Sequence, residues 1–240
     1  MVYFVKIVII AIWFFVGCAL GVIKIFFKGL TTTTSHEVGY MIGSVALKIA
    51  GIKLKIAGIE NLEKIKPCIY IGNHQSAFDA IVFAYLFPKK TIVIGKKEIR
   101  WIPFFGLLFK ATGNIMIDRK NREDSVSGLN QAVRAIQEKK YSVIIFPEGT
   151  RNKEAEIELL PFKKGAFHMA IQTRVPLIPI VCANIKPLVS WREKKLNSGT
   201  LEVSVLAPIF VTQTDTADDL LNRCRESMQK EFINLKTEVK

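Results

Sequence analysis

Four short apolar runs separated by helix-like segments constrain the fold of this chain more than any other feature. The runs read CIYIG, TIVIG, NIMID and SVIIF. Continuous apolar runs of this length are typical of strands that are buried on both faces of a sheet. Residues 77–87, 97–110 and 123–138 are the helix candidates between and after them. A strand followed by a helix, repeated along the chain, predicts an α/β fold with a mostly parallel sheet flanked by helices.

The remaining segments extend this pattern. IKLKI alternates like a half-buried strand, VPLIPIV and LEVSVLAP are further strand candidates, and helices are expected over residues 164–172 and 215–236. The prolines of VPLIPI are expected at the ends of their strand or on a sheet edge, because proline cannot donate to a ladder. No Gly/Ser/Pro linker interrupts the sequence, so residues 51–240 are expected to form one domain.

Residues 7–23 form a run of seventeen residues without a charge. This length is at the lower limit for crossing a hydrocarbon core of about 30 Å. No small-residue cleavage site follows, so we expect the run to remain in the protein as a membrane anchor. Lys24 and Lys28 follow the run and only Lys6 precedes it. This bias places the bulk of the chain at the cytoplasmic face of the inner membrane.

A second apolar helix is expected before the α/β domain. Ser35 is a candidate N-cap, apolar residues recur at helical spacing from Val38 to Ile49, and Gly51 suits the C-terminal cap. Two arrangements fit this pattern: a single membrane span, or a hairpin of two helices embedded in one leaflet. In either arrangement, residues 1–50 are the membrane-anchoring part of the chain.

The formal net charge of +13 favours an anionic partner. Nucleic acid, an anionic membrane surface, and a phosphorylated substrate or carrier all meet this criterion. The four cysteines, Cys18, Cys68, Cys182 and Cys224, form no C-x-x-C pair and have no zinc-ligand spacing. They are expected to be buried free thiols in a reducing compartment.

The turn after CIYIG carries His74 and Asp79, five residues apart. One interpretation is structural: Ser76 and Asp79 approach a capping box, and His74 bonds to backbone. The other interpretation is catalytic: His74 lies in the turn and Asp79 in the first helical turn, so the carboxylate meets one ring nitrogen. The second ring nitrogen is then free to accept a proton. This stretch alone leaves both interpretations open.

Cations follow three other predicted strands. Lys96 and Lys97 come after TIVIG, Arg119 comes after NIMID, and FPEGTR places Glu148 and Arg151 after SVII. The carboxyl ends of parallel strands meet at one edge of a sheet, where α/β proteins place their sites. Arginine binds phosphate in a bidentate manner, so this edge predicts an anion site. No nucleic-acid-binding motif is present, and the cations do not line one helix face, which argues against nucleic acid as the partner.

Four segments in this order resemble the motifs of the glycerolipid acyltransferase family. They are N-H-x4-D at Asn73–Asp79, GNIMIDR at Gly113–Arg119, FPEGTR at Phe146–Arg151, and VPLIPI at Val175–Ile180. GKKEIRWIPFFG and LPFKKGAFHMA resemble the bacterial branch that acylates 1-acyl-sn-glycerol-3-phosphate. The resemblance covers residues 52–206. One departure is Asn152, where a serine is common; a backbone group there would do the same work.

The resemblance implies that His74 is the general base and that Asp79 orients it. It implies that Arg151 and a lysine of the Lys96–Lys97 pair hold the phosphate of lysophosphatidic acid. Lys96 is the preferred candidate, but the sequence does not decide between the two lysines. Arg119, Glu148 and Gly149 match motif positions, and Arg119 is counted with the phosphate-binding residues. The implied donor is acyl-CoA or acyl-carrier protein, the product is phosphatidic acid, and no metal or cofactor is implied. One alternative is an acyltransferase for another acceptor, namely glycerol-3-phosphate, a lysophospholipid or a lyso-aminolipid. The others are a non-catalytic, membrane-anchored binder of anionic lipid or nucleic acid, and a membrane hydrolase.

Overall fold

The computed structural model describes residues 2–29, 32–152 and 158–240. Within these ranges the main sheet has eight strands in the order β1-β9-β6-β2-β5-β3-β4, with β10 paired to β9. The strands are β1 Ile52–Ala57, β2 Ile69–Gly72, β3 Thr91–Lys96, β4 Ile115–Ile117, β5 Ser142–Ile145, β6 Leu177–Cys182, β7 Val189–Ser190, β8 Lys195–Leu196, β9 Gly199–Val205 and β10 Thr237–Val239. The helices are α1 Val2–Lys28, α2 Thr32–Ala50, α3 Asn61–Lys64, α4 Asp79–Leu86, η1 Lys97–Trp101, α5 Phe105–Ala111, α6 Arg122–Lys139, α7 Gly165–Thr173 and α8 Ala217–Asn234.

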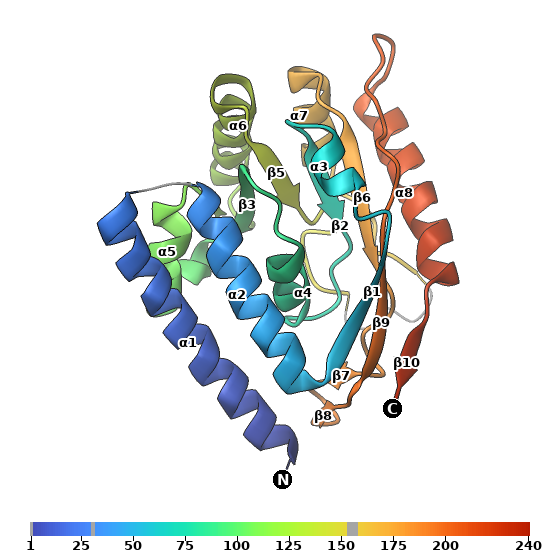
Figure 1. Ribbon diagram of the computed structural model, residues 1–240. Coiled ribbons are helices and arrows are strands. Elements are labelled where there is room, and N and C mark those ends of the chain that lie inside the picture. Colours follow the sequence, from blue (N-terminus) through green and yellow to red (C-terminus); the bar gives the residue numbers. More distant parts are fainter. Residues whose placement is uncertain (1, 30–31, 153–157) are drawn as a thin grey trace.

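The predicted α/β fold with a mostly parallel sheet is confirmed. β6, β2, β5, β3 and β4 run parallel to one another, and β1 runs parallel to β9. Antiparallel pairing joins β9 to β6 and β10 to β9. α2 and α4 cover one face of the sheet, while α6, α7 and α8 cover the other (Figure 1). The carboxyl ends of β2, β3, β4, β5 and β6 therefore share one edge of the sheet.

Alternation along β2 shows how the sequence divides the core between these two faces. Tyr70 packs in the cluster under α2 and α4, whereas Ile69 and Ile71 pack in the cluster under α6, α7 and α8. All three side chains are fully buried. A strand with both faces covered is apolar at successive positions, which is why β2 appears in the sequence as a continuous run. The four cysteines are also buried and free, as predicted.

Three predictions about elements outside the turn after β2 were wrong. The helix expected over residues 97–110 is split into η1 and α5, because Phe104 has a φ of +59° directly after Pro103. Ser35 is not an N-cap but lies inside α2, which extends back to Thr32. Gly51 does have the positive φ of +78° expected of a C-terminal cap, and its N–H bonds to Leu47 O.

The third error concerns Pro179, which lies inside the central strand β6 and not at a strand end or sheet edge. It pairs with Ile71 of β2 on one side of the strand. On the other side, its carbonyl accepts a hydrogen bond from Leu206 N, one residue after β9 ends. The ladder with β9 begins only at Ile180. The missing N–H of Pro179 therefore falls at the margin of a ladder, where its loss costs least.

α1 lies along the side of the molecule and does not project from it (Figure 1). Its inner face packs against α2 and α5, where Phe14 and Phe105 have ring centroids 5.0 Å apart. Lys6 Nζ donates to Ala50 O at the end of α2, and Lys24 pairs with Glu37. Among the described helices, α1 has the length and composition to cross a membrane. Its exposed apolar side chains are Val2, Phe4, Val5, Val8, Ile9, Ile12, Phe15, Val16, Leu20, Ile23, Phe26 and Phe27.

α2 packs directly on α4 through two glycines. A Cβ atom on Gly43 would lie 2.6 Å from the backbone nitrogen of Tyr85, and one on Gly39 would lie 3.1 Å from Ala84 O. These distances mean that the two helices touch backbone to backbone. The contact matters for the site, because α4 carries Asp79 in its first turn.

Candidate active site

The turn after β2 brings His74 and Asp79 together. His74 Nδ1 lies 2.8 Å from Asp79 Oδ2. Asp79 is 2% exposed and the His74 side chain is 17% exposed. An ionised carboxylate can only accept, so the Nδ1 atom carries the proton in this pair. The opposite ring nitrogen, Nε2, is then an acceptor and is available to take a proton.

Asp79 also fixes the backbone of the turn. Its Oδ2 atom accepts hydrogen bonds from Gln75 N at 2.6 Å and Ser76 N at 2.8 Å. The expected helix start at Ser76 was wrong, since α4 begins at Asp79 and its N-cap residue is Phe78. Ser76 Oγ instead accepts from Phe78 N at 3.2 Å. The same oxygen of Asp79 therefore binds the backbone of the turn, as the structural interpretation expects, and the imidazole, as the catalytic interpretation expects.

Two neighbours of His74 attach the turn to the end of β6. Asn73 exchanges two hydrogen bonds of 2.9 Å with the backbone of Cys182. Gln75 donates from Nε2 to Ala183 O at 3.0 Å and accepts from Ile185 N at 3.2 Å. Both amide side chains are buried. No local sequence signal predicts this role of Gln75, because its partners are more than one hundred residues away.

The FPEGTR segment holds the same turn from the side of β5. Glu148 Oε1 accepts from His74 N at 2.7 Å, and its Oε2 accepts from Leu160 N at 3.1 Å. Asn152 N donates to His74 O at 2.7 Å, so the backbone at this departure from the family pattern does contact the turn. The ring of Phe146 stacks on the imidazole with centroids 4.6 Å apart. The backbone N–H and C=O groups of His74 are thus both hydrogen-bonded, and one face of its ring is covered by Phe146.

Glu148 is an acidic residue that is buried away from solvent. Burial raises the pKa of Glu148 to about 7, although its hydrogen bonds from His74 N and Leu160 N oppose the rise. The nearby Asp79 carboxylate adds to the increase. A buried carboxyl group with a raised pKa beside a histidine–aspartate pair is typical of functional sites.

The predicted cations occupy the same edge of the sheet, with different environments. Arg119 is half-buried and donates from its guanidinium to Gly149 O at 2.8 Å. Gly149 has a φ of +68°, a conformation that favours glycine. Lys96 ends β3 and pairs with Glu98 at 2.8 Å, with its side chain 53% exposed.

Lys97 and Arg151 are the other two predicted cations. Lys97 lies 4.0 Å from Asp118. Arg151 is exposed, and its side chain has no hydrogen bond or ion pair with any residue in the described ranges. It directly precedes Asn152, which bonds to His74. Lys163 was not predicted as a site residue, yet its amine lies 3.0 Å from the position of a Cβ on Gly149.

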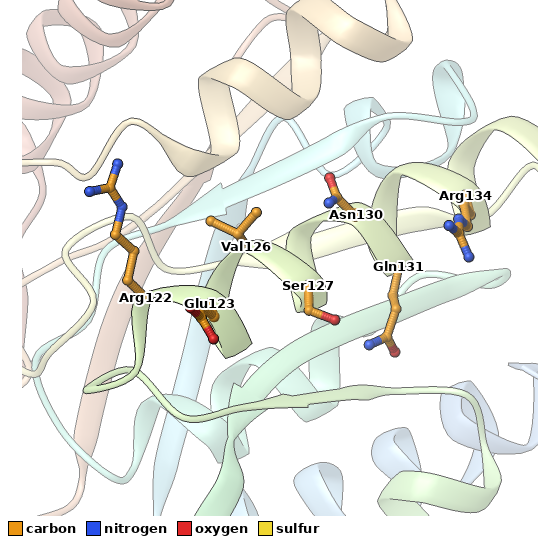
Figure 2. A pocket seen from close by; sticks show the side chains of 7 residues that line it. All are labelled: Arg122, Glu123, Val126, Ser127, Asn130, Gln131 and Arg134. Carbon is orange, nitrogen blue, oxygen red and sulfur yellow. The ribbon is translucent and has the colours of Figure 1, made fainter.

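A small cavity of about 110 Å³ lies beside these residues. Arg119, Gly149 and Lys163 form its polar part, and the rest of the lining is mostly apolar: Ile94, Ile117, Leu129, Ile145, Phe146, Pro147 and Ala166, with Ser125 and Gly165. A larger, shallow hollow of about 600 Å³ lies on the outer face of α6. Figure 2 shows that its lining side chains all come from that helix. None of the predicted site residues lines the larger hollow, whereas Arg119 and Gly149 line the small cavity. His74 and Asp79 line neither of the two.

The chain was compared with known families, curated proteins and solved structures. The family model described as Acyltransferase matches residues 53–183. The chain is 35% identical over 224 residues to the 1-acyl-sn-glycerol-3-phosphate acyltransferase of Haemophilus influenzae, covering 92% of this chain and 91% of that protein. It is 33% identical over 241 residues to the protein of the same name from Escherichia coli, covering 100% and 96%.

The fold has a counterpart among solved structures. The crystal structure of the 1-acyl-sn-glycerophosphate (LPA) acyltransferase PlsC from Thermotoga maritima superposes with a TM-score of 0.80 at 20% identity. The match covers 97% of this chain and 94% of that chain. At this identity the match supports the fold, and the family model with the full-length bacterial relatives supports the family. The chain therefore belongs to the acyltransferase family of enzymes.

Proposed function

We propose that this enzyme transfers an acyl group from a thioester to the 2-hydroxyl of 1-acyl-sn-glycerol-3-phosphate and so forms phosphatidic acid. One observation carries the proposal: an imidazole held by a buried carboxylate at 2.8 Å lies at the sheet edge to which Lys96, Arg119 and Arg151 belong. The base has an acceptor nitrogen for a hydroxyl proton, and the cations suit the phosphate of the same acceptor molecule. The names of the full-length relatives support this acceptor.

The proposed reaction is a direct transfer. Arg151, Arg119 and Lys96 hold the phosphate, and His74 Nε2 takes the proton from the 2-hydroxyl as its oxygen attacks the thioester carbonyl. The C–S bond then breaks, and the thiolate leaves with the proton returned by His74. Backbone N–H groups at the strand ends stabilise the tetrahedral oxyanion. Asp79 holds the imidazole in the correct tautomer and stabilises its charged form.

The acyl donor in this proposal is acyl-CoA or acyl-carrier protein, because both present the same thioester. Both are acidic, which suits a chain with a net charge of +13. The apolar lining of the small cavity beside Phe146 is compatible with the methylene groups of an acyl chain.

We further propose that α1 and α2 anchor the enzyme in one leaflet at the cytoplasmic face of the inner membrane. Of the two arrangements that the sequence left open, packing favours the one-leaflet hairpin. α1 packs on α5 as well as α2, and α2 packs on α4. A spanning α1 would bring these helices into the bilayer, whereas a helix lying in one leaflet exposes only its outer apolar face to lipid.

An acceptor comparison tests the proposed function. Purified full-length enzyme in detergent would be offered lysophosphatidic acid, glycerol-3-phosphate and lysophosphatidylcholine, each with C16 acyl-CoA. We expect phosphatidic acid from the first acceptor at the highest kcat/KM. Preference for glycerol-3-phosphate or lysophosphatidylcholine would replace the proposed acceptor, and free fatty acid as the main product would indicate a hydrolase.

A further inference from the structure

A short hairpin connects the catalytic turn to the N-terminal end of α1. It consists of β7, β8 and the turn between them, residues 189–196. Trp191 donates from Nε1 to Ser76 Oγ at 3.1 Å, within the turn that carries His74. Lys194 Nζ lies 5.7 Å from the ring centroid of Phe4 on the exposed face of α1. Figure 1 shows β7 and β8 beside the N-terminal part of α1.

The tip of this hairpin combines an exposed tryptophan with clustered cations. Trp191 is 47% exposed, and Arg192, Lys194 and Lys195 are exposed as well. Glu193 is the only acidic residue in the hairpin, and it pairs with Lys195 at 2.7 Å. The pKa of Glu193 is lowered by Lys195 first and then by Lys186 and Arg192, so these cations lie near one carboxylate. The hairpin surface therefore keeps an excess of positive charge.

We propose that the β7–β8 hairpin is a second membrane contact that binds the anionic headgroups of the leaflet in which α1 lies. The proposal rests on the membrane placement of α1 given above. Tryptophan concentrates at the interface between headgroups and acyl chains, where its ring is shielded and its N–H keeps a polar partner. Trp191 meets this description, because its N–H is bonded to Ser76 while its ring remains exposed.

Contact between the hairpin and α1 favours a lipid surface over an acidic protein. Phe4 is 56% exposed on the outer face of α1, and Lys194 lies over its ring. If that face of α1 is in the acyl region, Lys194 and its neighbours are at the level of the headgroups. Arginine and lysine close to an anionic leaflet are attracted to it over about a Debye length. The Trp191–Ser76 bond then links headgroup binding to the backbone around His74.

Tryptophan fluorescence tests this contact in the full-length chain. The variant W13F/W101F leaves Trp191 as the only tryptophan. In vesicles of phosphatidylcholine with phosphatidylglycerol, we expect its emission to shift to the blue and to be quenched by lipids brominated near the headgroup. In phosphatidylcholine alone, quenching is expected to be much weaker.

Charge variants measure how far the contact depends on anionic lipid. The quantity is the ratio of the partition coefficients for anionic and neutral vesicles. R192Q/K195Q is expected to lower this ratio about 25-fold, or about fivefold for each cation removed. K64Q/K230Q, which removes two exposed cations from α3 and α8, is the matched control and is expected to change it by less than about twofold.

Three outcomes would overturn the proposal. The first is unchanged quenching of Trp191 fluorescence by aqueous iodide when anionic vesicles are added. The second is an equal change in the partition ratio for R192Q/K195Q and for K64Q/K230Q. The third is protection of Trp191 by an acyl-carrier protein but not by vesicles. The variant W101F/W191F leaves Trp13 on α1, so its quenching reports the placement of α1 separately. Acyl transfer by R192Q/K195Q in neutral detergent, expected at the wild-type rate, keeps this test distinct from that of the proposed function.

Discussion

Glu148 is a residue whose protonation affects both the fold and the site. Its carboxyl group accepts one backbone hydrogen bond from His74 and one from Leu160, and its pKa is raised from 4.5 to about 7. A raised folded-state pKa means that the folded protein binds more protons than the unfolded chain between these values. The contribution of Glu148 to the free energy of unfolding therefore falls as pH rises from about 4.5 to about 7.

Replacing Glu148 by glutamine removes this pH-dependent contribution. The wild type is expected to lose on the order of 3 kcal/mol of stability at this group across the window, and E148Q is not. The variant is also expected to lose activity, because its amide NH₂ group faces one of the two backbone donors. Unfolding in detergent at pH 5 and pH 8 measures the difference, with E158Q on an exposed carboxylate as control. If the stability of E148Q and of the wild type depends on pH in the same way, the pH-dependent contribution attributed to Glu148 is excluded.

Arg151 is exposed and has no partner among the described residues, which suits a side chain that binds substrate. R151A is expected to raise KM for lysophosphatidic acid by at least about tenfold, since one charge-assisted contact contributes roughly 1.5–3 kcal/mol. Thermal stability should change little. R134A removes an exposed arginine on α6 and serves as the control. An unfolded R151A, or one with unchanged KM, would argue against a phosphate contact.

The sequence allowed the contact between His74 and Asp79 to be predicted, but not the contacts that hold the turn in place. His74 and Asp79 are five positions apart, so their contact across a turn could be anticipated from local geometry. Gln75 binds backbone groups of β6 that follow more than one hundred residues later. Phe146 likewise stacks on His74 only because β5 lies beside β2. Such contacts depend on strand order, which local patterns do not specify.

At the scale of elements, the contact between α2 and α4 couples the N-terminal helices to Asp79. G43A places a methyl group 2.6 Å from Tyr85 N, where backbone must move. It is expected to destabilise the protein by about 1–3 kcal/mol, less any gain in helix propensity. G39A meets Ala84 O at 3.1 Å and should cost less. The melting temperatures of the two variants in detergent give the comparison, and equal or raised values for G43A would contradict the close contact.

The strands that the sequence predicted best are those in the interior of the sheet. β2, β3 and β5 were predicted as continuous apolar runs because both of their faces are covered. β4 is an edge strand whose two isoleucines are buried on one face, with the half-buried Met116 between them. β10 was missed because Thr237–Val239 is short and lies on β9 at the sheet margin with little apolar signal. The start of α2 was predicted too late because Ser35 was taken as an N-cap, whereas the helix extends back to Thr32.

At the scale of the whole molecule, the outer face of α1 is the proposed route of membrane attachment. V8E/I12E changes two side chains that are about half exposed, so folding should be preserved. The charges are costly in an acyl environment, and the protein is expected to move from the membrane pellet toward the soluble fraction. V126E changes a similarly exposed valine on α6 and should remain with the membrane. Full retention of V8E/I12E would show that α1 is not the principal anchor.

The central claim is that His74, fixed by Asp79, is the base that activates the acceptor hydroxyl. The most direct measurement is the rate of phosphatidic acid formation by H74A from lysophosphatidic acid and acyl-CoA, with folding checked by melting temperature. We expect a folded protein whose kcat falls by about 10²–10⁴-fold, because general-base help of this kind has that magnitude. A folded H74A protein with activity within a few-fold of wild type would contradict the mechanism.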